Sequence, residues 1–206
     1  MPRRAQPQAE PPLKRDLLVA TRRIFAEQGY DAISMRKVAA EVGCTATAIY
    51  LYFKDKDALM ESMVVEDFLE IASTFEALRD EADPVERLRR FCYQFFGWAQ
   101  TNPHHYRFLF MTPRPPLDPE AAQERNRPEV NAYLMAMEAA HQAFKQGRIH
   151  PRFSDGDALI QTLLAGVHGV IALHLSNFND PWIPWKPWDH RAQLMIDSLF
   201  ESVLTA

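Results

Sequence analysis

The chain has 206 residues, of which 47% are hydrophobic and 24% are charged, the balance of a globular protein with a sizeable core rather than of a disordered one. The net charge of −4 is unevenly spread, because residues 1–60 contain ten basic and seven acidic side chains and the remainder contains 13 basic and 20 acidic ones. A basic part joined to an acidic body is typical of a DNA-reading domain attached to another domain, although solvated surfaces show such differences too.

The location in the cell is predicted from what the sequence lacks. No apolar run approaches the roughly eighteen residues that a membrane span needs, and residues 1–12 have no apolar stretch of the kind found in a signal peptide. Cys44 and Cys92 lie far apart and fit reduced thiols better than a disulfide. Cys44 is interpreted as a core residue, with a redox switch as the alternative. We therefore expect a cytoplasmic protein with no membrane partner.

Helical periodicity runs through the chain after residue 12, and no convincing strand pattern appears. Residues 1–12 are rich in Pro, Gln and Arg and are expected to be disordered, with Arg3 and Arg4 touching a minor groove as the alternative. The fold class that follows is all-α, with about nine helices. In chain order, helices are expected at about 13–28, 35–42, 45–52, 55–75, 84–101, 103–112, 128–146, 155–177 and from 188 to near the end. A long loop or frayed helix start is expected at 112–126, and an extended loop at 181–187.

Residues that start and stop helices support these boundaries. Ser34 and Asp83 are good N-caps for the second and fifth helices, and Pro84 suits the first turn that follows. Gly29 and Gly43 supply left-handed stops after the first and second helices. The second and third helices are therefore expected to be separated only by a tight turn.

Residues 34–53, SMRKVAAEVGCTATAIYLYF, combine two short amphipathic helices joined at Gly43. Val38, Ala39 and Val42 are expected to face inward. The spacing predicts a helix-turn-helix whose second helix enters the major groove of DNA. An αα-corner inside some other helical domain is the alternative that spacing alone leaves open.

A longer similarity bears on this choice. Residues 20–59, ATRRIFAEQGYDAISMRKVAAEVGCTATAIYLYFKDKDAL, closely resemble the DNA-binding head of the TetR family. The matching features are F-A-E-x-G-Y, R-x-V-A-x-x-x-G and I-Y-x-Y-F-K-x-K-x-x-L. The resemblance implies a homodimer that reads two half-sites about 34–36 Å apart, or a multiple of that turn. It also implies three parts: a disordered arm at 1–12, a helix-turn-helix domain at 13–57, and a ligand-binding and dimerisation domain at 58–206.

Carried over position by position, the resemblance assigns DNA contacts to residues of the head. Arg36 and Lys37 match positions that reach the groove edge or the backbone, and Arg36 can fork onto a guanine. The recognition helix carries no charge, and its residues Ala46, Thr47, Ala48 and Leu51 would read thymine methyl groups and DNA shape. The alternative is that Ala46 and Ala48 merely permit close approach. The expected phosphate contacts come from Ser34, Thr45, Tyr50 or Tyr52, and Lys56.

The last two helices are the expected dimer interface. Small residues let two helices approach closely, and both helices have wide apolar faces. Packing within one chain is the alternative. The expected interface residues are Ala165, Gly169, Ala172 and Ser176 on one helix and Ala192, Met195 and Leu199 on the next.

Residues 91–110 hold eight aromatic side chains, which form either a solid core or the wall of an apolar cavity. This part resembles a TetR-type C-terminal domain through N-P-H-H-Y-R-F-L-F at 102–110 and A-G-V-H-G-V at 165–170, and the resemblance implies a small-molecule sensor. His168 would donate a hydrogen bond to a ligand, or is a core histidine. The expected ligand contacts are Phe91, Phe95, Trp98, Tyr106, Phe110, Met135, His141 and His168.

Together these features predict a repressor that a small hydrophobic effector releases from a double-stranded DNA operator. The alternatives are a DNA-binding dimer without a ligand, and an activator. An enzyme is not expected, because no nucleophile elbow, glycine-rich phosphate loop, HExxH motif or carboxylate–histidine cluster is found in the sequence. The seven histidines show no metal-binding spacing, so neither a metal nor a cofactor is expected.

Overall fold

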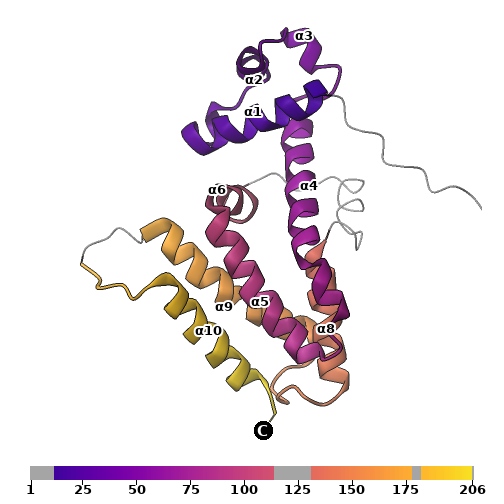
Figure 1. The fold of residues 1–206 in the computed structure, drawn as a ribbon, viewed down its shortest axis with the longest axis vertical. Helices are drawn as coiled ribbons and strands as arrows, with labels where there is room; N and C mark the ends of the chain where they lie inside the picture. The colour runs from indigo at the N-terminus through magenta and orange to yellow at the C-terminus, as the bar shows by residue number, and fades with distance from the viewer. Residues whose placement is uncertain (1–11, 114–130, 178–181, 206) are drawn as a thin grey trace, which may run out of the picture. The chain divides into compact units, whose positions relative to one another are not determined.

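The computed structural model describes residues 12–113, 131–177 and 182–205 of the chain. Within them the protein is all-α, as expected, with nine α-helices and no strand (Figure 1). The chain divides into two compact units, residues 1–66 and 67–206, and the boundary lies inside the fourth helix, later than the expected boundary after residue 57. The expected N-terminal arm before Pro12, with Arg3 and Arg4, and most of the expected loop at 112–126 lie outside the described residues.

The first unit is formed by consecutive short elements that share one aliphatic core. Side chains that are fully buried come from each of its helices, at the spacing expected of amphipathic helices: Leu17, Leu18, Val38, Ile49 and Leu59. The elements are α1 (Pro12–Gln28), the 3-10 turn η1 (Tyr30–Ala32), α2 (Met35–Val42), α3 (Ala46–Ile49) and the first part of α4 (Lys56–Phe75).

The predicted cap at Ser34 and the left-handed stop at Gly43, with φ +77° and ψ +24°, are confirmed. Gly29 also has a positive φ of +81°, which a residue with a Cβ rarely adopts, but its ψ of 177° lies outside the left-handed helical region. The third helix ends at Ile49, earlier than expected, because the next amides turn back to carbonyls three residues earlier: Leu51 N to Ala48 O at 3.3 Å and Tyr52 N to Ile49 O at 3.0 Å.

The second unit is a bundle in which α9 packs against α5, α8 and α10 (Figure 1). The N-cap of α5 is the expected one, because Asp83 Oδ1 accepts hydrogen bonds from Val85 N at 2.8 Å and Glu86 N at 3.3 Å. Besides the rest of α4, the unit contains η2 (Glu76–Asp80), α5 (Pro84–Thr101), α6 (Pro103–Tyr106), the π-helical turn η3 (Arg107–Met111), α8 (Ala132–Lys145), α9 (Gly156–Asn177) and α10 (Trp188–Val203).

One expectation about apolar runs is corrected. Among the described residues, Gly156–Ser176 in α9 is long and apolar enough to cross a membrane by length and composition, and 33% of this stretch is buried inside the structure. The sequence pattern was missed because Gln161, Thr162 and two histidines interrupt the run without removing its apolar character. Helices packed in the middle of a soluble bundle have the same composition, and α9 contacts three other helices.

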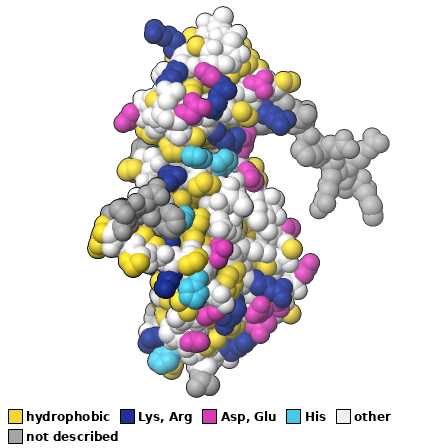
Figure 2. Space-filling model, turned by 60° about the vertical axis from the view of Figure 1, so that its left-hand side comes forward, with side chains coloured by type: hydrophobic (Ala, Val, Ile, Leu, Met, Phe, Trp, Pro, Cys, Tyr) yellow, Lys and Arg dark blue, Asp and Glu magenta, His cyan; other side chains and the backbone are white. Residues whose placement is uncertain are grey.

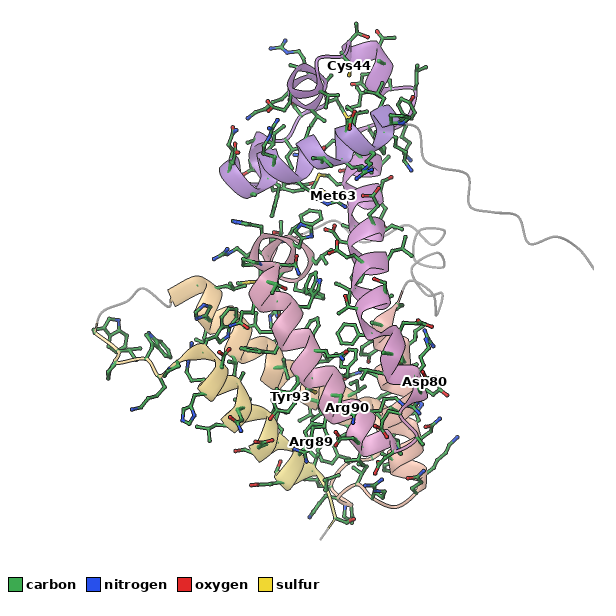
Figure 3. All side chains as sticks on the ribbon, in the orientation of Figure 1. Cys44, Met63, Asp80, Arg89, Arg90 and Tyr93 are labelled. Carbon is green, nitrogen blue, oxygen red and sulfur yellow. The ribbon has the colours of Figure 1, made fainter. Side chains whose placement is uncertain are left out.

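Polar contacts tie α5 to its neighbours inside the second unit. The carboxylate of Asp197 on α10 accepts hydrogen bonds from Arg89 Nη1 at 3.1 Å and from the Tyr93 hydroxyl at 2.9 Å. Figure 3 labels these two donor residues, Arg89 and Tyr93. Arg148, after α8, donates to Asp83 Oδ1 at 2.6 Å. On the face drawn in Figure 2, acidic and basic side chains are interspersed rather than separated by sign. The hydrogen bonds to Asp197 and Asp83 fix the contacts between helices that are distant in the sequence.

Candidate nucleic-acid interface and aromatic cluster

Two side-chain caps position the short helices of the first unit. Ser34 Oγ accepts a hydrogen bond from Lys37 N at 3.3 Å, and Thr45 Oγ1 accepts one from Ala48 N at 3.2 Å. Both residues are exposed. Because each hydroxyl only accepts in its cap, its own O–H and the remaining amides of the first turn can still donate to an anion such as a phosphate.

The outer face of α3 and of the turn after it is exposed and uncharged. Ala46 and Thr47 are exposed, Tyr50 is 54% and Leu51 is 80% exposed, and Tyr52 is half-buried. The inner face is held by Ile49, which is fully buried. Leu51 exposes a large apolar side chain in the turn directly after α3, and the buried Ile49 holds this segment against the core. Such a side chain is suited to contact with thymine methyl groups.

The basic side chains of this unit differ in how far they are already engaged. Arg36 on α2 is exposed, whereas Lys37 Nζ is hydrogen-bonded to Gln28 Oε1. Lys56 Nζ donates to Tyr30 O at 3.0 Å and lies 4.0 Å from the centroid of the Tyr30 ring. Since an ammonium group has three donors, Lys56 keeps two for a phosphate while it also fastens α4 to η1.

Cys44 lies in the turn between α2 and α3 and is a free thiol (Figure 3). It was expected in the core, but it is only half-buried, as are Phe25 and Val42. Val42 and Cys44 flank Gly43, whose turn leaves both side chains partly open to solvent. Cys92, in contrast, is buried in α5, and burial raises the pKa of its thiol to about 12.

The expected dimer residues divide into exposed and buried ones. Ala165 and Ser176 on α9 are exposed, Gly169 and Ala172 are half-buried, and Met195 on α10 is 36% exposed. The assignment of Ala192 to the dimer interface is corrected, because its side chain is 3% exposed within the single chain and has no surface to offer to a second copy. Leu199 is half-buried and contacts Gly166, where an added methyl group would collide with it. The side of α10 that carries Ala192 packs inside the chain, and the residue on its exposed side that the sequence reasoning missed is Leu194, 55% exposed.

Four of the expected ligand contacts, Phe95, Trp98, Phe110 and His168, have ring contacts with Tyr106, which is fully buried. The centroid of its ring lies 5.8 Å from that of Phe95, 4.9 Å from that of Phe110 and 5.6 Å from that of His168. Rings at such distances make edge and offset contacts that add to burial of apolar surface. We call the following residues the aromatic cluster: Phe91, Phe95, Trp98, Tyr106, Phe110 and His168.

Polar groups inside this cluster are uncharged at neutral pH. The Tyr106 hydroxyl is hydrogen-bonded to His168 Nδ1. Burial lowers the pKa of His168 and raises that of Tyr106, so both groups stay neutral. Trp98 Nε1 and Gln94 Oε1 are buried and have no hydrogen-bond partner among the described residues. A buried donor and a buried acceptor without partners are costly in a folded protein, which makes them candidates for ligand contacts.

Met135 and His141 on α8 have different surroundings. Met135 is 4% exposed, so it belongs to the core of the second unit. His141 Nε2 lies 3.0 Å from Asp157 Oδ1, and both side chains are about half exposed. Asp157 precedes His168 by eleven residues on α9, roughly 16 Å along a helix. The assignment of His141 to the ligand site is therefore corrected, because its partner is at the far end of α9.

Sequence reasoning missed a second group of polar residues. Asp67 and Glu70 on α4 and His105 on α6 bring a carboxylate oxygen each and an imidazole nitrogen within 4.8 Å of one another. The statement that the sequence has no carboxylate–histidine cluster is thereby corrected. The only local signal was the i, i+3 spacing of the two acids, and the histidine comes from a different helix.

Two family models match the chain. Residues 17–63 match the model for bacterial regulatory proteins of the tetR family, and residues 88–199 match the model for the tetracyclin repressor-like C-terminal domain. The first match includes α2, α3 and the start of α4. The second covers the elements that carry the aromatic cluster and the faces of α9 and α10.

Individual proteins give a similar result. An uncharacterized HTH-type transcriptional regulator of Haemophilus influenzae is 36% identical over 97 residues, which are 47% of this chain and about half, 52%, of the relative. The nucleoid occlusion factor SlmA of Escherichia coli is 30% identical over 143 residues, 68% of each protein. The crystal structure of a TetR-family transcriptional regulator from Haemophilus influenzae matches with a TM-score of 0.68 and 25% identity, covering 96% of this chain and 100% of that one.

Proposed function

The chain belongs to the TetR family of bacterial regulatory proteins, and from this membership we propose that it is a dimeric, DNA-binding transcriptional repressor that an uncharged aromatic effector releases from its operator. The observation that carries the DNA-binding part is the outer face of α3 and of the turn after it, where Leu51 is 80% and Tyr50 is 54% exposed next to a buried Ile49. A face of this kind, flanked by capped helix N-termini, matches the demands of a DNA groove.

The proposed contacts divide into positioning and reading. Phosphates would be bound by Ser34, Thr45, Lys56 and either Tyr50 or Tyr52. Arg36 is exposed and would contact a base. Thr47 and Leu51 would touch thymine methyl groups. Two copies joined through the exposed sides of α9 and α10 would read two half-sites, and occupation of a promoter by such a dimer would exclude polymerase.

The effector class follows from the aromatic cluster. Its ring surfaces favour a flat apolar molecule, and its polar groups are all neutral at pH 7. A buried ion without an opposite charge would be strongly disfavoured there. We therefore propose an uncharged aromatic compound whose acceptor atom meets Trp98 Nε1 and whose donor meets Gln94 Oε1, two buried atoms of α5 without a hydrogen-bond partner among the described residues.

Release requires a modest coupling between effector and DNA. A hundredfold loss of DNA affinity corresponds to about 2.7 kcal/mol, which a single buried ring is able to supply if it binds the two states differently. The helix α4 belongs to both units, residues 56–66 to the first and 67–75 to the second. In this proposal a shift of its second half changes the orientation of the DNA-reading face.

A dimer that binds DNA without any effector is the second candidate. It is favoured by the mutual ring contacts of the aromatic cluster, which are also those of a solid core, and by the name of the relative SlmA, a nucleoid occlusion factor rather than a regulator. An activator differs from a repressor only in the position of its operator, so the same contacts serve both.

The test measures binding of the full-length protein to a fluorescent duplex from the region upstream of its own coding sequence, then adds uncharged aromatic compounds. We expect specific binding at about 10⁻⁸ M or tighter, weakened about a hundredfold by an effective compound. Trp98→Phe, which removes the indole N–H together with part of the ring, should keep DNA binding and lose the response, and Thr47→Ala should change the preference between sites. If no duplex is preferred over random DNA, the proposal fails. If DNA binds but no compound acts and Trp98→Phe has no effect, the second candidate is correct.

A further inference from the structure

We propose that Asp67, Glu70 and His105 form a binding site for a divalent transition-metal ion of the zinc type. The site lies within the second unit, where the second half of α4 meets α6. Its three donor atoms, two carboxylate oxygens and one imidazole nitrogen, all lie within 4.8 Å of one another. Neither the DNA-reading face nor the aromatic cluster uses these side chains.

The first argument is geometric. Asp67 Oδ1 lies 3.4 Å from His105 Nδ1, close to the spacing of two ligands in a tetrahedral zinc site, about 3.4 Å for bonds of roughly 2.0–2.2 Å. No separation in the group exceeds 4.8 Å, so the widest has to shrink by at most about 1.4 Å. Glu70 is exposed and has a long flexible side chain, so it supplies this movement without disturbing the helix.

The second argument is the burial of Asp67. Its side chain is 1% exposed, although it is a carboxylate that shares its site with another carboxylate one helical turn away. Two acids in such a position repel each other, and the low dielectric around a buried group enlarges this cost. A divalent cation between them would neutralise both charges, while the neutral imidazole adds a lone pair without adding charge.

The donor set selects the class of metal. One nitrogen and two oxygens suit Zn²⁺ and neighbouring divalent ions, whereas Mg²⁺ and Ca²⁺ prefer oxygen ligands alone. Cys92 and Cys44 are not part of the group, so no sulfur ligand favours a softer ion. Three protein ligands leave at least one position for water or a further ligand, and the exposed Glu70 marks the side from which the ion would enter.

A metal here would link α4 to α6. Phe68, next to Asp67 on α4, makes an edge contact with Phe110 of the aromatic cluster, with ring centroids 6.1 Å apart. A metal bond between α4 and α6, the helix directly before the η3 turn that carries Phe110, would therefore restrain the second half of α4 beside this contact. The inference concerns the metal alone and stands whether or not the proposed effector exists.

The test uses untagged, full-length protein freed of metal with a chelator, dialysed against Zn²⁺ and assayed for bound zinc. We expect about one ion per chain, held in competition with millimolar Mg²⁺. His105→Gln and Glu70→Gln should each weaken binding at least tenfold. The matched control is His104→Gln, which removes the neighbouring exposed histidine and should bind as the parent does.

Asp67→Asn is a less clean variant, because the residue is buried, so its far-ultraviolet circular dichroism is checked first. Glu70→Gln avoids this difficulty, because its side chain is exposed. Absence of stoichiometric zinc in the parent protein, or unchanged binding in both Glu70→Gln and His105→Gln, overturns the proposal. None of these measurements involves DNA, so they are independent of the proposed repressor function.

Discussion

The two units of the molecule reach their functional residues in different ways. In the first, Ser34, Gly43 and Thr45 act on residues three or four positions away, and the exposed face of α3 follows directly from these caps. In the second, the aromatic cluster draws on α5, α6, η3 and α9, so Tyr106 meets His168 across 62 positions of sequence. The first is a local construction and the second is assembled by packing.

This difference determines what each unit tolerates. A local construction depends on a few caps and on one small core, so a single deletion in that core should affect the whole unit. An assembled site depends on long-range pairs, such as Arg148 with Asp83 and Arg89 with Asp197. Its residues form a larger core, which spreads the cost of any one substitution over many contacts.

The largest expected effect tests the small core of the first unit. Phe53→Ala removes a ring that is 2% exposed and should lower the free energy of unfolding of this unit by about 3–5 kcal/mol, measured by urea denaturation. Leu51→Ala, two residues earlier and 80% exposed, is the matched control and should change stability by less than about 0.5 kcal/mol while weakening DNA binding. Equal losses in the two variants would contradict the assignment of an inner and an outer face.

The next effect concerns a long-range pair of the second unit. Asp83→Ala removes the N-cap of α5 and the partner of Arg148, and should cost about 1–2 kcal/mol; the pair itself is partly exposed and adds only a small part. Asp83→Asn keeps a capping oxygen and should cost less. An Asn variant as unstable as the Ala variant would show that the ion pair, not the cap, stabilises this end.

The same residue gives a prediction about pH. The hydrogen bond from Arg148 holds the pKa of Asp83 below its ordinary value of 3.8. A carboxylate with a lowered folded pKa contributes stability above 3.8 and loses it as the pH falls through the folded value. The difference in free energy of unfolding between the parent and Asp83→Asn should therefore be constant at neutral pH and shrink only below about pH 4.

The sequence alone was enough to predict features that depend on interactions between residues close together in the chain. The caps, the stop at Gly43 and most of the inner face of the first unit were predicted, because each depends on spacing within one or two helical turns, whereas Cys44 and Val42 are only half-buried. Prediction was wrong for Ala192 and His141, whose surroundings are set by which side of a helix meets another helix. The group of Asp67, Glu70 and His105 was missed for the same reason, since a histidine 35 positions after Glu70 gives no pattern that a single sequence reveals.

A smaller effect tests the electrostatics of the first unit. Lys56→Ala should weaken binding to operator and unrelated duplexes alike, and reduce the slope of log affinity against log salt by about one, because one phosphate contact is lost. Its bond to Tyr30 O predicts an accompanying small loss of stability, measured separately. The control is Lys145→Ala, which removes an exposed lysine in the last turn of α8. It should leave the salt slope unchanged for the operator and for unrelated duplexes. A change confined to the operator would instead assign Lys56 to base reading.

The smallest effect returns to the assembled site. Burial lowers the pKa of His168 below 6.5, so as the pH falls the unfolded chain takes up a proton before the folded one does. His168 therefore contributes stability that is complete above about pH 6.5 and is lost as the pH falls toward its folded pKa, with a slope of at most about 1.4 kcal/mol per pH unit. His168→Asn keeps an acceptor for the Tyr106 hydroxyl and should flatten the stability curve between pH 7.5 and 5, whereas His190→Asn, at an exposed position on α10, should not. If His168→Asn and the parent have parallel curves, the histidine is hydrated in the folded protein, and the argument for an uncharged effector loses its electrostatic basis.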